Sequence, residues 1–166
     1  SVEQLSATDL FGPAVVIDIS EQSETNPDYI LSKSDILKWE TVNGVLPKGV
    51  IVLLYTGWSK KWNDYKAYKN EDSNGKMHFP GFSREAAQFL IDERDIKGIG
   101  IDNMSVDAAQ AKGLPVHSVV NGSGKYQLEN VANLHLLPPK GIFLIVAPVK
   151  IQGGSGGQVR LYAVLR

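Results

Sequence analysis

The chain has 166 residues, of which 43% are hydrophobic and 21% charged, and its formal net charge is −1. These values fit a single globular domain spanning residues 1–166, and they exclude a basic nucleic-acid surface, a polybasic membrane patch and an acidic tail. The apolar runs at 50–55 and 142–149 are too short to cross a bilayer. Cysteine is absent, which excludes disulfides, thiolate zinc sites and cysteine nucleophiles but leaves the compartment unknown.

The first third of the sequence predicts two strands and one helix. Ala14–Ile19 is a short β-branched run typical of a buried strand, and the polar stretch Ser20–Pro27 after it is expected to be a loop. A serine at position 32 or 34 can cap a short helix that ends near Glu40, because its side-chain oxygen accepts a hydrogen bond from a free amide of the first turn. A Leu-Pro-Lys-Gly turn then leads into the strand Val50–Tyr55.

The middle of the sequence predicts a long loop followed by a helix and a strand. Trp58–Phe82 is an irregular stretch rich in lysine, asparagine, aspartate and aromatic residues, and loops of this length in compact domains usually carry function. Ser83 is expected to cap the helix Arg84–Arg94, which has one apolar stripe at helical spacing. The strand Ile96–Ile101 follows. Strand, helix and strand at this spacing form a βαβ unit, so part of the sheet is predicted to be parallel.

The last third of the sequence predicts short helical segments and two more strands. Ala108–Lys112 is expected to form one helical turn, and Pro115–Val120 either to begin a helix or to form a short strand. Leu128–Asn133 follows a glycine-rich turn, and the final strands are Ile142–Val146 and Val159–Leu165. Five or six strands with few helices predict a mixed α/β domain.

His117 and Glu129 are the candidates for metal chemistry. The three histidines, at 78, 117 and 135, do not form the i, i+4 pair of a helical zinc motif. Glu129 lies twelve residues after His117, beyond a turn that could bring imidazole and carboxylate together, as a borderline divalent metal requires. Judged by spacing alone, the simpler interpretation is that His117 is a surface histidine and Glu129 a solvated glutamate.

Two further positions have open alternatives. Asp102 ends a strand, where α/β folds often place functional groups, but it could instead cap the turn that follows it. Trp58 and Trp62 could form an aromatic wall for a planar substrate, or they could anchor the long loop to the core.

An ordered series of segments carries the strongest signal. It includes Pro-Val-His at 115–117, Glu-Asn-Val-Ala-Asn at 129–133 and Lys-Ile-Gln-Gly-Gly at 150–154. The full series is Leu10–Asp18, Leu46–Trp58, Pro80–Ser83, Ile99–Asp107, Leu114–His117, Leu128–Leu134 and Pro148–Gly156. Together these segments resemble the cyclase family, which includes bacterial kynurenine formamidase and isatin hydrolase, over nearly the whole chain.

The resemblance implies a fold, a reaction and a set of site residues. The fold would be the mixed-sheet, swivelling β/β/α cyclase-like domain, usually assembled as a dimer or tetramer. Family enzymes use zinc or manganese to activate water against a linear or cyclic amide, and the arylformamidases are one such group. By resemblance, His117 and Glu129 are metal ligands, Trp58 lines the substrate pocket, and Asp102 and Ser105 support the site.

The family's His-x-Gly-Thr-His-x-Asp-x-Pro-x-His motif, which supplies the remaining ligands, does not occur in these 166 residues. We therefore expect one of three situations: an N-terminal fragment of the same precursor or a second subunit completes the site, the chain is a binding or structural protein without catalysis, or an N-terminal portion is omitted. The start at Ser1 suggests processing, and no signal peptide is recognisable. Without its N-terminal strands the domain should expose sheet edges and apolar surface, which a partner chain or an oligomer interface would cover.

Overall fold

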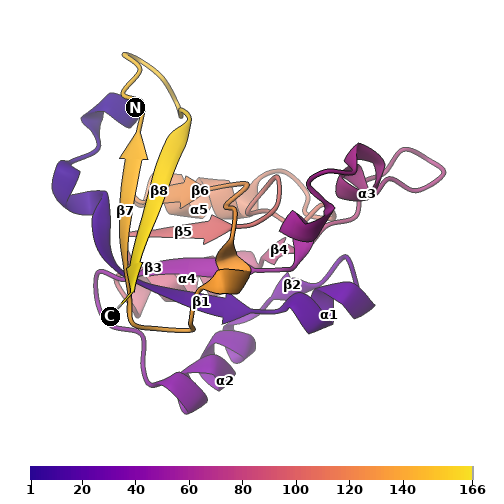
Figure 1. Cartoon of the computed structure of the whole chain (residues 1–166), viewed down its shortest axis with the longest axis horizontal. Coiled ribbons are helices and arrows are strands. Elements are labelled where there is room, and N and C mark those ends of the chain that lie inside the picture. Colours follow the sequence, from indigo (N-terminus) through magenta and orange to yellow (C-terminus); the bar gives the residue numbers. More distant parts are fainter. Residues whose placement is uncertain (166) are drawn as a thin grey trace.

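The fold is built around a mixed six-stranded sheet. A computed structural model describes residues Ser1–Leu165. The strand order is β6-β5-β3-β1-β7-β8; β1, β3, β5 and β6 are parallel, and β7 and β8 are antiparallel additions at one edge (Figure 1). The strand bounds are β1 Phe11–Asp18, β3 Ile51–Tyr55, β5 Gly98–Ile101, β6 Tyr126–Leu128, β7 Ile142–Pro148 and β8 Val159–Leu165. The predicted mixed α/β class is confirmed.

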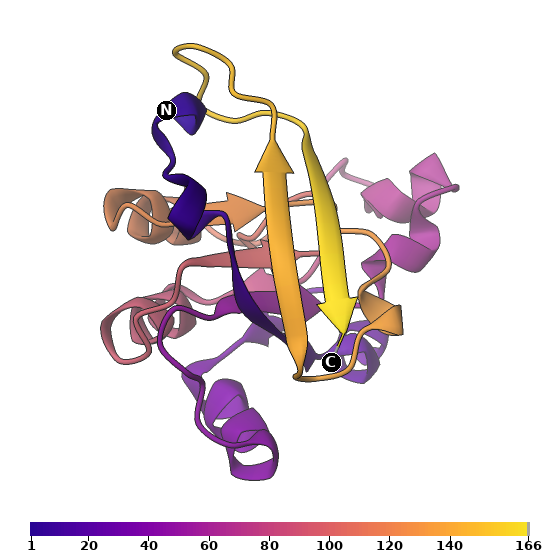
Figure 2. The ribbon, with the colours of Figure 1, turned by 60° about the vertical axis from the view of Figure 1, so that its left-hand side comes forward.

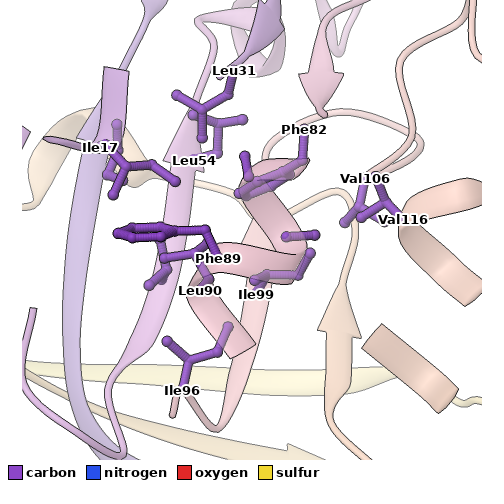
Figure 3. Packing of buried hydrophobic residues seen from close by; sticks show 14 of the residues in the cluster. Ile17, Leu31, Leu54, Phe82, Phe89, Leu90, Ile96, Ile99, Val106 and Val116 are labelled. Carbon is purple, nitrogen blue, oxygen red and sulfur yellow. The ribbon is translucent and has the colours of Figure 1, made fainter. Parts of the chain in front are cut away.

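Helices cover one face of the sheet. They are α2 (Lys33–Asn43), α4 (Arg84–Asp92) and α5 (Pro115–Gly122). Ser32 caps α2 and Ser83 caps α4, each by accepting a hydrogen bond from an amide of the first helical turn, as predicted. The apolar stripe of α4 packs on β3 and β5, where Phe89 and Leu90 meet strand residues such as Ile99 (Figure 3). This packing also confirms the βαβ unit, since β3 and β5 are parallel neighbours.

The other face of the sheet is covered by the chain's own ends. β7 and β8 turn steeply across the parallel strands (Figure 2). The N-terminal turn η1 (Val2–Gln4) lies beside the loop that joins these two strands, and η2 (Ala7–Asp9) lies next to β1. η4 (Leu134–Leu136) contributes Leu134 to a second core cluster between these elements and the sheet. Within the described residues, no helix has the length and apolar character needed to cross a membrane.

Two segments predicted to be irregular contain regular structure. The stretch 20–27 includes α1 (Ser20–Thr25), and the stretch 58–82 includes η3 (Trp58–Lys61), α3 (Tyr65–Lys69) and β4 (Gly81–Phe82), which pairs with β2 (Ile30–Leu31). These predictions were wrong because α1 buries only Ser23 and α3 buries no residue, so neither helix carries an apolar stripe in its sequence.

The segment before α5 also differs from the prediction. Residues 108–112 form a turn rather than a helical turn, and the helix begins at Pro115, which favours the helix over the short strand. Pro115 suits the first position of a helix, because an N–H at that position has no acceptor within the helix and proline loses nothing by lacking it. The parallel strands β3, β5 and β6 all end at the same edge of the sheet, so the loops that follow them converge.

Candidate functional site

His117 lies in the first turn of α5, where a buried carboxylate holds it. Asp107 accepts three hydrogen bonds: from Val116 N at 2.7 Å, from His117 N at 3.2 Å and from His117 Nδ1 at 2.6 Å. A carboxylate can only accept, so the proton of the neutral imidazole is on Nδ1 and Nε2 presents its lone pair. We call Asp107 with these three hydrogen bonds the clamp, and it fixes both the tautomer and the direction of the His117 ring.

Glu129 meets this imidazole on its other side. It is the first residue after β6, and its Oε1 lies 3.5 Å from His117 Nε2. Val106 N donates to the same oxygen at 3.3 Å. The side chains of His117 and Glu129 are 24% and 32% exposed, so both line an accessible surface rather than the core. The structure thus brings together the two residues that the sequence singled out.

Asp107 is the functional residue that sequence reasoning missed. It lies ten positions before His117, within a loop, and only the folded chain shows that its carboxylate caps α5. A signal was present, because the residue before Pro115 is Leu114, whose side chain has no oxygen that could cap the helix. A helix without its own cap implies an acceptor from elsewhere in the chain.

Asp102 does not cap the turn that follows it, which was one of the two alternatives for this residue. Its side chain is 1% exposed and accepts hydrogen bonds from the backbone N–H and the hydroxyl of both Thr56 and Ser59, at 2.6–3.1 Å. The turn after Asp102 is instead stabilised by Asn103, whose Oδ1 accepts from Ser105 N at 3.0 Å. Asp102 therefore ties the loop after β3 to the end of β5.

Ser105 contacts the backbone of Asp107. The Ser105 hydroxyl accepts a hydrogen bond from Asp107 N at 3.2 Å, next to the residue that clamps His117. Ser105 therefore contacts Asp107 rather than His117 itself.

Trp58 is buried in the loop after β3. It is 2% exposed, its Nε1 donates to Tyr68 O at 2.9 Å, and Lys61 Nζ lies 3.4 Å from the ring centroid. Burial against this ring lowers the pKa of Lys61. These contacts favour the anchoring interpretation of Trp58, and a direct contact with substrate stays a prediction. Trp62, in contrast, is exposed and packs edge-on against Tyr68.

Tyr68 contacts the residue that follows Glu129. Its hydroxyl donates to Asn130 Oδ1. Burial raises the pKa of Tyr68 to about 12, and the nearby carboxylates of Asp102 and Glu129 add to the shift. The phenol therefore stays protonated at neutral pH and acts as a neutral donor beside two carboxylates.

The donors of this site fit one side of a divalent metal centre. Two ligands at about 2.1 Å from a tetrahedral metal lie roughly 3.4 Å apart, close to the 3.5 Å between Nε2 and Oε1. An imidazole held from behind by a carboxylate is the usual arrangement of a metal-binding histidine. Within residues 1–165, however, no group of three or more His, Cys, Asp or Glu side chains is placed to hold a metal ion.

Comparison with known proteins identifies the family. The sequence profile of the cyclase family, described as putative cyclase, matches residues 1–108. Isatin hydrolase of Roseibium aggregatum is 35% identical over 167 residues, which covers 98% of this chain and 63% of that protein.

Solved structures give the same result. Isatin hydrolase A of Labrenzia aggregata, bound to benzyl benzoate, matches with a TM-score of 0.93 and 38% identity, covering all of this chain and 66% of that one. Isatin hydrolase A of Ralstonia solanacearum matches with a TM-score of 0.94 and 37% identity, covering 100% and 64%. The chain thus spans less than two thirds of each of these relatives, and its fold is the predicted cyclase-like one. The chain belongs to the cyclase family.

Proposed function

We propose that this chain carries part of the active site of a metal-dependent hydrolase that opens a linear or cyclic amide, with His117 and Glu129 as two metal ligands. The observation that carries the proposal is the pair of donors 3.5 Å apart, one of them an imidazole whose Nδ1 is held by Asp107. The names of the relatives support the reaction, since proteins at 35–38% identity are isatin hydrolases. An arylformamide or a lactam such as isatin is the proposed substrate class.

The residues of this chain would each have a defined task. A zinc or manganese ion, when bound, would polarise the amide carbonyl and lower the pKa of a bound water. Asp107 keeps the lone pair of His117 Nε2 directed toward Glu129, and Ser105 holds the backbone of Asp107. Trp58 would support the wall of the substrate pocket.

We further propose that polypeptide outside these 166 residues supplies the remaining ligands, as an N-terminal part of the same protein or as a second subunit. A catalytic zinc site needs three protein ligands, and two would hold the ion weakly. The surface of β7 and β8 supports this: among the described residues no strand pairs with the outer edge of β8, and Ile145, Tyr162 and Val164 are exposed. An apolar strand at a sheet edge is normally covered in the complete assembly.

Metal analysis of the complete protein, together with hydrolysis assays on isatin and N-formylkynurenine, tests the proposal. We expect close to one tightly bound zinc or manganese per site and turnover of at least one of these amides. His117→Ala and Glu129→Gln should lose both metal and activity. His135→Ala, which removes an exposed histidine outside the site, is the matched control and should retain both.

Absence of bound metal together with absence of turnover of either amide, both in the complete protein, would refute the proposed enzymatic function. The alternative would then hold, namely a catalytically incomplete member of the family that acts as a binding or structural component. The same outcome would remove His117 and Glu129 from the list of ligands.

A further inference from the structure

Glu129 is held only lightly by its own contacts. Its carboxylate accepts one hydrogen bond, from Val106 N at 3.3 Å, and faces His117 Nε2 at 3.5 Å. Asp107, by comparison, accepts three hydrogen bonds and is nearly fully buried. Because so little fixes the carboxylate directly, its direction depends on the backbone that carries it.

That backbone turns sharply at the next residue. Asn130 has a positive φ of 56°, a conformation that asparagine tolerates better than most residues. Asn130 N donates to Asn103 O at 2.8 Å, and Val131 N donates to Ile101 O at 2.9 Å. The turn thus returns the chain to the end of β5, and the side chain of Asn130 is left projecting from it.

Tyr68 binds this projecting side chain from a distant part of the sequence. The Tyr68 hydroxyl donates to Asn130 Oδ1, and the two residues are 62 positions apart. Tyr68 is itself anchored, since its carbonyl accepts from the Trp58 indole at 2.9 Å and its ring packs edge-on against Trp62 with centroids 5.4 Å apart. The hydrogen bond therefore joins a fixed segment to the turn that carries Glu129.

We propose that Tyr68 is a positioning residue, whose hydroxyl holds Asn130 and thereby keeps the Glu129 carboxylate directed at His117. This inference rests on the proposed function, because the consequence of the positioning is metal affinity. The phenol is suited to the task, since it stays protonated near two carboxylates and so donates at all physiological pH values. Supporting residues around a metal site typically change its affinity 10- to 100-fold when removed.

A double-mutant cycle in the complete protein tests the inference, with Mn²⁺ and Zn²⁺ as the probes. Tyr68→Phe removes only the hydroxyl, and Asn130→Gly removes only the acceptor, since glycine adopts a positive φ without strain. We expect each variant to bind metal roughly tenfold more weakly, and the double variant to be no weaker than either single one. Excess metal should restore turnover in all three.

Tyr65→Phe is the matched control, because Tyr65 lies on the same helix and is 78% exposed. It should bind metal as the unaltered protein does. Thermal unfolding of Tyr68→Phe should shift by no more than roughly 2–4 °C, the effect of losing one hydrogen bond.

The outcomes separate the two proposals. Normal metal binding by Tyr68→Phe, or additive losses in the double variant, would overturn the positioning role while leaving the metal site in place. Absence of metal binding in the unaltered complete protein would overturn the proposed function and the positioning role together. A loss of turnover that excess metal does not restore would also contradict positioning.

Discussion

The clamp on His117 gives the most direct test of the site's geometry. In the variant Asp107→Asn, the side chain keeps its shape, but one acceptor oxygen becomes an NH₂ group. Three donors point at this carboxylate, from Val116 N, His117 N and His117 Nδ1. At least one of them must then face another donor, in a site where Asp107 is nearly fully buried.

The expected magnitude follows from those contacts. An unpaired buried donor costs about 1–3 kcal/mol, and a lost helix cap typically costs about 1 kcal/mol. We therefore expect Asp107→Asn to lower the free energy of unfolding by about 2–4 kcal/mol, which lowers Tm by roughly 5–15 °C in a domain of this size. Metal affinity should also fall about 10- to 100-fold, because the imidazole can turn or change tautomer.

Thermal unfolding and metal titration measure these two effects separately. Asp92→Asn is the matched control, since its carboxylate makes only an exposed hydrogen bond with Gln88 on α4. A surface change of this kind should alter stability by less than about 0.5 kcal/mol. If Asp107→Asn unfolds and binds metal as the control does, the clamp does not orient His117 and the reasoning is wrong.

Three further changes have defined outcomes. The hydrogen bond from Arg94 lowers the pKa of the buried Glu40, so this pair stabilises the fold above about pH 4.5, and the contribution is lost as pH falls through the lowered pKa. Glu40→Gln should therefore lower the free energy of unfolding in urea by about 2 kcal/mol and make stability less sensitive to acid. The hydrogen bond to Asp28 raises the pKa of His78, so the stability that this pair contributes is present below pH 6.5 and is lost as pH rises through the raised pKa. His78→Gln should therefore reduce the change of Tm with pH between pH 5.5 and 8.5. Gly81→Ala would place a Cβ 2.3 Å from the backbone N of residue 108. This clash should lower the free energy of unfolding by about 2–3 kcal/mol and weaken metal binding by displacing the loop that carries Asp107.

The elements that were readable from the sequence are those whose burial follows a local pattern. β3 is buried at every position, and α4 carries four buried apolar residues on one face, so both segments have an unmistakable composition. α1 and α3 have no such pattern: α1 buries only Ser23, and α3 buries no residue, although Asp64 caps its first turn. Propensity and periodicity do not report contacts of this kind.

The site was predictable only in part for a related reason. His117 and Glu129 were found through their resemblance to a family, not through their spacing. The residues that hold them belong to distant segments: Asp107 caps a helix it does not adjoin, and Tyr68 meets Asn130 across 62 positions. The fold of β5, α5 and β6 creates these contacts; Leu114 before Pro115 indicates that α5 needs an acceptor from elsewhere, but not which residue supplies it.

Three carboxylates near the site differ in how many hydrogen bonds they accept, and this difference separates support from ligand. A carboxylate has about four lone-pair sites. Asp102 accepts four hydrogen bonds and Asp107 accepts three, so neither has much capacity left for a cation. Glu129 accepts a single bond at 3.3 Å, is one third exposed, and faces the free Nε2 of His117. Of the three, Glu129 is therefore the carboxylate left available to bind a metal, and the other two keep the loops around it in place.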